Sequence, residues 1–248
     1  MIHRAIEERI HNALAKKKAV TIMGPRQVGK STLADAIIPK DARILEINGD
    51  NTDVQTMFIN VDEAKMKVLI GNKNFLFVDE AQKIENVGNM LKIVAEKFKD
   101  VKIIVTGSSA FKLAEAVNES LTGRKREFRL YPLSFKEMAD ETSTLEESRM
   151  IDHRLIYGYY PEVVTSPGDE KEVLKELIDS YLYKDVMEEN NIAKPDKLVK
   201  LVQALAFQIG STVSANELAG LVGIDAKTVE RYIEILEKSY IIFTLPSY

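Results

Sequence analysis

Short apolar runs alternate with longer amphipathic stretches along the first half of the chain. Phe75-Leu-Phe-Val78 is a continuous apolar run, which is typical of a strand buried on both faces of a parallel sheet. Between such runs apolar residues recur at helical spacing, as at Ile6, Ile10 and Leu14. This alternation predicts an α/β fold, with a parallel sheet between helical layers. The expected strands are 19–23, 43–47, 75–78, 101–105 and 127–131, and the expected helices are 3–15, 31–37, 61–70, 87–98 and 113–121.

The second half of the chain has a different pattern. Residues 140–148 are polar and charged, and we interpret them as a linker at a domain boundary. The pattern after them is mostly helical, which predicts a region of helices and one final strand. These helices are expected at 149–157, 171–190, 197–209, 216–222 and 226–238, and the strand at 240–245. We divide the chain into a core over 1–140, a helical lid or linker over 141–205 and a winged helix-turn-helix over 206–248.

Composition narrows the class of protein. The 248 residues include no cysteine and three histidines, which excludes disulfides and thiolate metal sites and argues against a zinc site built from histidine. No apolar stretch approaches the ~20 residues of a membrane-spanning helix. Residues 1–8 lack the apolar segment of a secretory signal. We expect a cytoplasmic protein that binds no membrane, and its net charge of −4 gives it no general attraction to nucleic acid.

A glycine-rich loop follows the first predicted strand. Gly24-Pro-Arg-Gln-Val-Gly-Lys-Ser31 fits the pattern G-x-x-x-x-G-K-[ST] and leads directly into a predicted helix. Backbone N–H groups of such a loop, together with the helix N-terminus, bind phosphate oxygens. Lys30 would contact the β- and γ-phosphates, and Ser31 would bind Mg²⁺. The residues predicted to bind ATP are Gly24, Pro25, Arg26, Gln27, Val28, Gly29, Lys30, Ser31 and Thr32.

Two carboxylates follow the third predicted strand. Asp79 and Glu80 come 49 and 50 residues after Lys30, directly behind the apolar run 75–78. The carboxyl ends of parallel strands meet at one edge of the sheet, so both side chains are expected near the phosphate loop. Asp79 would hold Mg²⁺ together with Ser31, and Glu80 would activate the water that attacks the γ-phosphate.

The order of several motifs resembles that of a known protein class. The chain resembles the AAA+ class of P-loop ATPases and, more narrowly, prokaryotic AAA-type ATP-binding proteins with an ATPase core, a helical and winged-helix region, and a C-terminal domain of unknown function. This resemblance implies ATP rather than GTP as the nucleotide. The motifs that carry it are Gly24-Pro-Arg-Gln-Val-Gly-Lys-Ser31, Val78-Asp-Glu-Ala-Gln82, Val105-Thr-Gly-Ser-Ser109, Gly123-Arg124, Tyr131-Pro-Leu-Ser-Phe135 and Gly158-Tyr-Tyr-Pro-Glu-Val163.

The resemblance also implies two further catalytic positions. A polar residue that senses the γ-phosphate is expected after the strand 101–105, and Ser108 is our choice, with Thr106 and Ser109 as alternatives. An arginine finger is expected at Arg124. Lys125 and Arg126 are the alternatives at that place, and a finger acting in trans would require a homo-oligomer, which the sequence leaves open.

The last forty residues predict two short helices joined by a glycine turn and followed by a strand, which is typical of a winged helix-turn-helix. Residues 216–238 carry five acidic and three basic side chains. A recognition helix near DNA phosphates should instead be basic. DNA is therefore a possible partner that the sequence does not favour, and a lid or partner surface is the alternative.

Taken together, these features predict an ATPase that uses Mg²⁺ to hydrolyse ATP to ADP and phosphate and couples its nucleotide state to a conformational change. The alternatives are an ATP-gated switch or DNA-binding regulator with little turnover, and a nucleotide-binding interaction module. Nothing in the sequence identifies a protein client. Because the resemblance implies that relatives continue beyond residue 248, we expect a shortened form that ends at a domain boundary.

Overall fold

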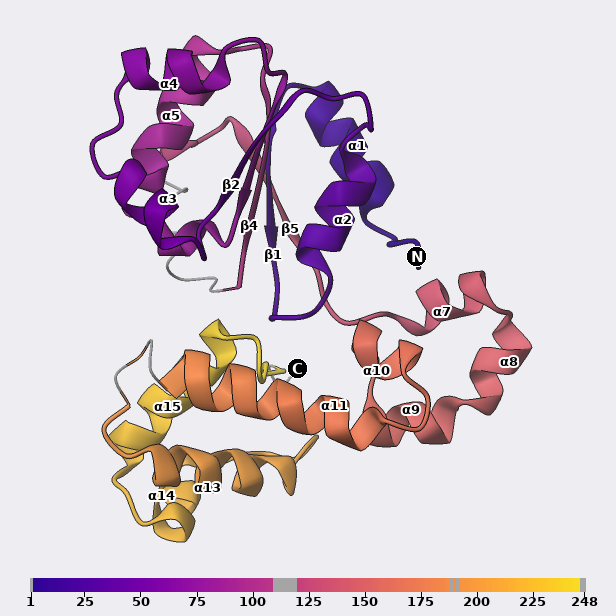
Figure 1. Ribbon diagram of the computed structural model, residues 1–248. Helices are drawn as coiled ribbons and strands as arrows, with labels where there is room; N and C mark the ends of the chain where they lie inside the picture. The colour runs from indigo at the N-terminus through magenta and orange to yellow at the C-terminus, as the bar shows by residue number, and fades with distance from the viewer. Residues whose placement is uncertain (1, 109–119, 188–189, 191, 246–248) are drawn as a thin grey trace. The chain divides into compact units, whose positions relative to one another are not determined.

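The computed structural model describes residues 2–108, 120–187, 190 and 192–245 (Figure 1). It divides the chain into two compact units, one through Glu170 and one from Lys171. The predicted helix 113–121 falls almost wholly outside the described residues, as does Ser109.

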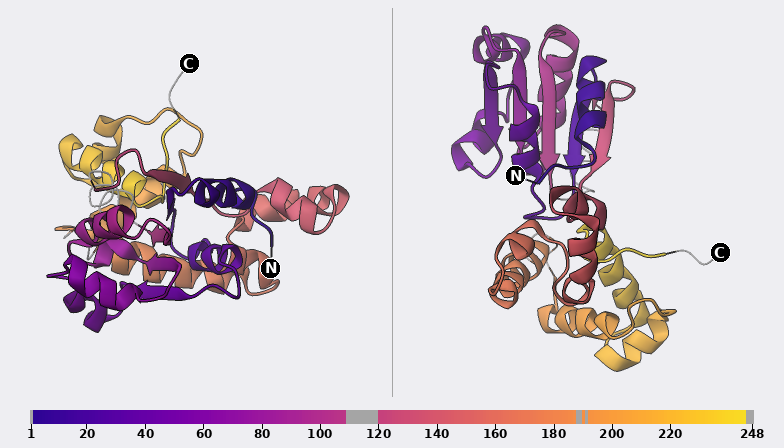
Figure 2. Two further views of the ribbon diagram at one scale, coloured as in Figure 1. Left: turned by 90° about the horizontal axis from the view of Figure 1, so that it is seen from above. Right: turned by 90° about the vertical axis from the view of Figure 1, so that its right-hand side faces the viewer.

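A parallel sheet forms the centre of the first unit. Its strands, within the described residues, are β1 (Ala19–Met23), β2 (Ile44–Asn48), β3 (Phe75–Asp79), β4 (Lys102–Gly107) and β5 (Lys125–Arg129). They lie in the order β2-β3-β4-β1-β5, all running in the same direction (Figure 2, right). The five predicted strands and the parallel α/β arrangement are therefore confirmed, with boundaries that differ by at most two residues.

Helices cover both faces of this sheet (Figure 1). α1 (Glu7–Ala15) and α2 (Lys30–Ile37) lie on one face, while α3 (Thr52–Met57), α4 (Glu63–Ile70) and α5 (Val87–Lys97) lie on the other. Successive side chains of a strand point to opposite faces, so the central strands β1, β3 and β4 bury apolar residues in both layers. One buried cluster joins Val20, Ile22, Phe75, Phe77 and Ile104 of the strands to Ile10, Leu14, Leu33 and Ile37 of α1 and α2.

Residues 140–148 do not form the predicted linker. They belong to α7 (Phe135–Glu141) and α8 (Thr144–Arg149), which α9 (Ile151–Tyr157) and α10 (Pro161–Thr165) follow. Ser134 and Glu137 form a capping box at the start of α7, and Ser143 accepts a hydrogen bond from the N–H of Glu146 at the start of α8. The stretch thus lies in two helices and at the N-cap Ser143 between them, and N-cap residues are of the same types as linker residues.

Helices make up the second unit. α11 (Glu170–Leu177) continues into η2 (Ile178–Val186), a π-helical segment, and α13 (Pro195–Ala206), α14 (Ala215–Val222) and α15 (Ala226–Lys238) follow. α14 packs against both α13 and α15. The unit's buried side chains include Leu198, Leu201, Leu218, Val222, Val229, Tyr232 and Leu236. No helix in the described parts of the chain has the length and apolar character to cross a membrane.

The predicted strand 240–245 does not form. Tyr240 has a φ of 57°, and the N–H groups of Tyr240 and Ile241 donate to the carbonyls of Glu237 and Leu236. This is a Schellman cap, which closes α15 and uses the residues that were expected to begin the strand. The described residues of this unit also provide no strand with which 240–245 could pair. The helix pair α14–α15 therefore has no strand forming a wing within the described residues.

Truncation of a core residue should weaken the second unit alone. Leu201 on α13 is fully buried, so Leu201→Ala should destabilise this unit by about 3 kcal/mol through lost contacts and the cavity left behind. Hydrogen exchange measured by mass spectrometry should show faster exchange in α13–α15 and unchanged exchange in β1–β4. The control Leu221→Ala removes the same atoms from a side chain that is 64% exposed and should change little. Similar effects of the two substitutions would contradict this packing.

Candidate nucleotide site

The loop between β1 and α2 has the backbone that a phosphate loop requires. Gln27 and Gly29 have φ values of 57° and 92°, so the chain curls tightly before α2 begins at Lys30. No side chain caps the N-terminus of α2, and the N–H groups of its first turn lack intrahelical partners by geometry. A Cβ atom on Gly24 would lie 2.0 Å from the carbonyl oxygen of Leu130, so glycine is required at that position.

Lys30 lies inside this loop. Its side chain is 4% exposed, and its Nζ atom donates to the carbonyl oxygens of Gly24 at 3.1 Å and Pro25 at 2.8 Å. The same atom lies 3.9 Å from Oε1 of Glu80. Burial lowers the pKa of Lys30, while the negative charges of Glu80 and Asp79 act in the opposite direction. The lysine cation is therefore held between the loop carbonyls and the carboxylate that the sequence assigned to catalysis.

Ser31 and Asp79 meet at the edge of the sheet. Ser31 Oγ donates to Asp79 Oδ2 at 2.9 Å, and the Thr106 hydroxyl donates to Asp79 Oδ1. A hydroxyl and a carboxylate are both hard oxygen ligands of the kind that Mg²⁺ prefers, so this pair fits the ion. In the part of the chain that the structure describes, no group of three or more His, Cys, Asp or Glu could hold a metal. Phosphate and water would therefore complete the coordination of Mg²⁺, as is usual for this ion.

Glu80 is held by two neighbours. Its Oε2 atom accepts hydrogen bonds from Ser108 Oγ at 2.8 Å and from Gln82 Nε2 at 2.6 Å, and Gln82 Nε2 also donates to Ser108 Oγ at 3.0 Å. The backbone of Glu80 has a φ of 46°, which is uncommon for a non-glycine residue and often marks a functional site. A Cβ on Gly49 would lie 2.3 Å from the Glu80 carbonyl oxygen, so the residue directly after β2 must also be glycine.

The structure separates two of the sensor candidates, Thr106 and Ser108, and Ser109 lies outside the described residues. Thr106 is fully buried. Its hydroxyl donates a hydrogen bond to Asp79 and accepts one from the backbone N–H of Glu80 at 3.2 Å. Ser108 is only partly buried and contacts the Glu80 carboxylate. Sequence reasoning missed Gln82, although that residue stands in the motif Val78-Asp-Glu-Ala-Gln82 and two residues after Glu80.

Arg4 is a second residue that sequence reasoning missed. Its side chain is buried, and its guanidinium donates to the carbonyl oxygens of Val28 at 3.0 Å and Tyr131 at 2.6 Å, and to Glu137 Oε1 at 3.2 Å. Arg4 thus ties the phosphate loop to the end of β5 and to α7. No sequence signal marks it, because a lone arginine before an amphipathic helix normally lies in solvent.

The structure does not bring Arg124 to this site. Arg124 immediately precedes β5, whose first residue pairs with Ala19 at the start of β1. The phosphate loop leaves the other end of β1, about 13 Å away along the strand. The Arg124 guanidinium instead contacts Glu96 at 2.9 Å. Arg124, Lys125 and Arg126 therefore lie away from the site of their own chain, and an arginine finger at one of them stays a prediction for a neighbouring copy.

The remaining predicted residues of the loop have different surroundings. Val28 is fully buried in the cluster beneath α1 and α2, so it contributes to the site through its backbone alone. Arg26 is partly buried, and Thr32 is exposed on the first turn of α2.

Comparison with known families gives two matches along the chain. Residues 16–139 match a family model described as an AAA domain, and this segment contains the phosphate loop, both carboxylates and Ser108. Residues 148–248 match a domain of unknown function, DUF8612.

Curated relatives carry no assigned function. An uncharacterized protein of Methanocaldococcus jannaschii is 26% identical and aligns with 99% of this chain and 60% of its own length. An uncharacterized protein of Haemophilus influenzae is also 26% identical and aligns with 71% of this chain and 46% of its own length. The chain therefore spans about half of the length of the curated relatives it matches.

Solved structures give distant similarities. The ORC1 protein of Aeropyrum pernix, solved in complex with DNA, has a TM-score of 0.45 and 11% identity, covering 96% of this chain and 84% of its own. The Pif1 helicase from Candida albicans has a TM-score of 0.38 and 14% identity, covering 71% of this chain and 47% of its own. Neither similarity is close enough to carry an argument about function.

Loss of Arg4 should destabilise the first unit. The substitution Arg4→Met leaves Glu137 as a buried charge without its cation, so we expect a loss of about 3 kcal/mol. Hydrogen exchange should become faster in β1, α2 and α7. The control Lys136→Met removes an equal charge from an exposed neighbour and should change stability by less than about 0.5 kcal/mol. Equal effects of the two variants would contradict the role assigned to Arg4.

The ion pair between Arg4 and Glu137 should make the free energy of unfolding depend on pH. Burial raises the pKa of Glu137. Hydrogen bonds from the N–H groups of Ala5 and Ser134, together with the charge of Arg4, lower it by more than burial raises it, so the net shift is downward. The ionised carboxylate therefore stabilises the fold above about pH 4.5, and this contribution is lost as pH falls through the lowered pKa. Unfolding free energies measured between pH 3 and 6 should fall less steeply with acid in Glu137→Gln. Parallel curves for the two proteins would rule out this contribution.

Proposed function

Because the chain belongs to the AAA domain family, we propose that it binds ATP with Mg²⁺ and hydrolyses it to ADP and phosphate. The observation that carries the proposal is the meeting of two sequence-distant motifs at one sheet edge. Ser31 Oγ lies 2.9 Å from Asp79 Oδ2, and Lys30 Nζ lies 3.9 Å from Glu80 Oε1. These four groups are the cation, the metal ligands and the base that phosphoryl transfer to water needs.

Each residue has a role in binding that follows from its surroundings. The N–H groups of the loop and of the first turn of α2 would bind the phosphate oxygens. Lys30 would exchange its contacts with the loop carbonyls for the β- and γ-phosphates. Ser31 and Asp79 would hold Mg²⁺, which when bound neutralises charge that develops on the transferred phosphoryl group.

Hydrolysis is assigned to Glu80. Its carboxylate would accept a proton from the attacking water, in an orientation that Ser108 and Gln82 fix through their hydrogen bonds to Oε2. Ser108 contacts this carboxylate directly and is our proposed sensor of the γ-phosphate. Gln82 is a positioning residue in this proposal, since it touches Glu80 and Ser108.

A change at the phosphate loop would be transmitted through Arg4. This side chain joins the carbonyl oxygen of Val28 in the loop to Glu137 on α7. A loop that moves on binding or losing the γ-phosphate would therefore shift α7 and the helices after it. This path is our proposal for the coupling of nucleotide state to conformational change.

Other parts of the proposal concern partners. Arg124 would reach a γ-phosphate only from a neighbouring copy in a homo-oligomer. We propose residues 141–205 as a helical lid, and residues 206–248 as a helix-turn-helix that serves as a lid or partner surface. DNA binding through α15 is the alternative, and Glu230 and Glu234 on its exposed face oppose it.

Two substitutions test the proposal. Lys30→Met should abolish ATP binding, because it removes the cation from the loop, while the exposed Lys40→Met should not.

Glu80→Gln should retain Mg·ATP binding but lower turnover by at least about a hundredfold, since it removes only the base. Glu85→Gln, five residues along in an exposed position, is the matched control and should hydrolyse normally. Binding is measured by calorimetry and turnover by phosphate release.

The results separate the alternatives. Normal turnover in Glu80→Gln would contradict the assignment of the base. Tight ATP binding with negligible turnover in the unmodified chain would favour the ATP-gated switch or the interaction module instead.

A further inference from the structure

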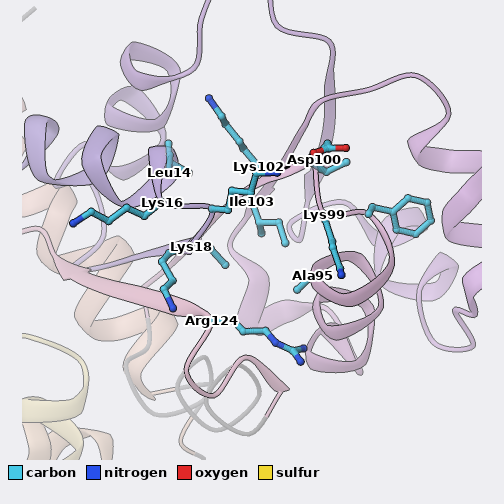
Figure 3. A pocket seen from close by; sticks show the side chains of 13 residues that line it. Leu14, Lys16, Lys18, Ala95, Lys99, Asp100, Lys102, Ile103 and Arg124 are labelled. Atoms are coloured by element: carbon cyan, nitrogen blue, oxygen red, sulfur yellow. Dashed lines mark hydrogen bonds and ion pairs between the residues drawn. The ribbon is translucent and has the colours of Figure 1, made fainter.

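The structure contains a basic pocket at the edge of the sheet opposite the phosphate loop. A cavity of about 190 Å³ lies at the C-terminal ends of α1 and α5, where β1, β4 and β5 begin (Figure 3). The residues that line it include six cations, Lys16, Lys17, Lys18, Lys99, Lys102 and Arg124. We call this cavity the basic pocket. It lies at the opposite edge of the sheet from the proposed ATP site of the same chain.

Few acids balance these cations. Asp100 is the acidic residue in the lining, and it contacts Lys17 at 3.0 Å, while Glu96 contacts Arg124 at 2.9 Å. All four side chains are more than a third exposed, so both pairs are screened by solvent and weak. The pocket thus keeps a clear positive excess in a chain whose net charge is −4.

Helix dipoles account for only part of this charge. A cation after the last turn of a helix is favourable, which explains Lys16 and Lys99. Lys17 has a φ of 54° and occupies the left-handed position of the cap that closes α1, where glycine is usual. Lys18 and Arg124 each precede a strand.

Three of the cations gather on one side of the pocket. In Figure 3, Lys18, Lys99 and Arg124 extend to the same side, while Lys16 and Lys102 extend away from it. Lys18 is positioned by a hydrogen bond to the carbonyl oxygen of Gly123, next to Arg124. Two ammonium groups and one guanidinium provide point charges and a planar fork, the donors that recognise phosphate.

We propose that the basic pocket binds phosphate groups of a polyanionic ligand. Its volume is below the roughly 300–1,000 Å³ of pockets that enclose a drug-sized molecule. It accommodates a short run of phosphates, not a whole nucleotide. The phosphates come either from a nucleic-acid backbone that passes over the pocket or from a free polyphosphate.

The test compares two variants of equal charge in the full chain. The pocket variant carries Lys18→Gln, Lys99→Gln and Arg124→Gln. The control variant carries Lys171→Gln, Lys200→Gln and Lys227→Gln, three exposed lysines of the second unit. The probes are a labelled single-stranded oligonucleotide and inorganic tripolyphosphate, each titrated across a salt series. The phosphate loop is unchanged in both variants, and the titrations use protein at a concentration where it is monomeric, so that no Arg124 of a neighbouring copy reaches that loop and its own binding is a common background.

We expect the pocket variant to bind at least one probe about tenfold more weakly than the control variant does. If the oligonucleotide is affected, the slope of log affinity against log salt should fall by about 2, since three phosphate contacts are lost. A loss for both probes or for the oligonucleotide alone identifies a nucleic-acid backbone, and a loss for tripolyphosphate alone identifies a free polyphosphate.

A third variant shows whether a loss of binding in the pocket variant results from lost charge or from misfolding. Lys18→Arg, Lys99→Arg and Arg124→Lys together keep the charge and should restore binding. Equal affinities of the pocket and control variants for both probes would overturn the proposal. Poly-glutamate binding that is as tight and as sensitive to the pocket variant as phosphate binding would also overturn it, because the pocket would then select charge and not phosphate.

Discussion

The candidate site depends on a contact between two side chains, Ser31 on the helix after β1 and Asp79 at the end of β3. These two strands are not neighbours in the sheet. β4 lies between them in the sheet, so their ends are separated by two strand spacings, or about 10 Å. Ser31 crosses part of that distance because the loop curls back over the sheet edge, and Asp79 reaches out to it at 2.9 Å. Thr106, near the end of the intervening β4, is buried and donates its hydroxyl to Asp79 Oδ1.

The same constraint explains the unusual backbone around the site. Gln27, Gly29 and Glu80 all have positive φ, which turns the chain sharply where a loop or strand reaches the sheet edge. Gly24 and Gly49 stand where another backbone passes too close for a Cβ atom. Strain in this region is thus concentrated where the loop and the carboxylates converge, as is common at functional sites.

The sequence was most informative where one physical requirement set the pattern. A strand buried on both faces must be almost wholly apolar, so the central strands β1, β3 and β4 could be predicted, and the loop pattern located Lys30 and Ser31. The predictions of a linker at 140–148 and of a strand at 240–245 were wrong, because each amino-acid composition is compatible with more than one local structure. Residues 140–148 lie in two helices and at the N-cap Ser143 of the second, and the apolar residues after Ser239 follow a helix cap. Arg4 could not be found, because its burial depends on Val28, Tyr131 and Glu137, which are distant in sequence.

The parallel sheet gives the first unit two chemically different edges. Loops after the strands bring the carboxylates, Lys30 and Ser31 together at one edge, whereas helix ends and strand starts gather cations around Lys18, Lys99 and Arg124 at the other. The central claim is that Ser31 and Asp79 hold one Mg²⁺ with the nucleotide. A double-mutant cycle of Ser31→Ala and Asp79→Asn on Mg²⁺-dependent ATP affinity tests it most directly. We predict that the double variant loses clearly less than the sum of the two single losses, whereas strictly additive losses would contradict a shared metal site.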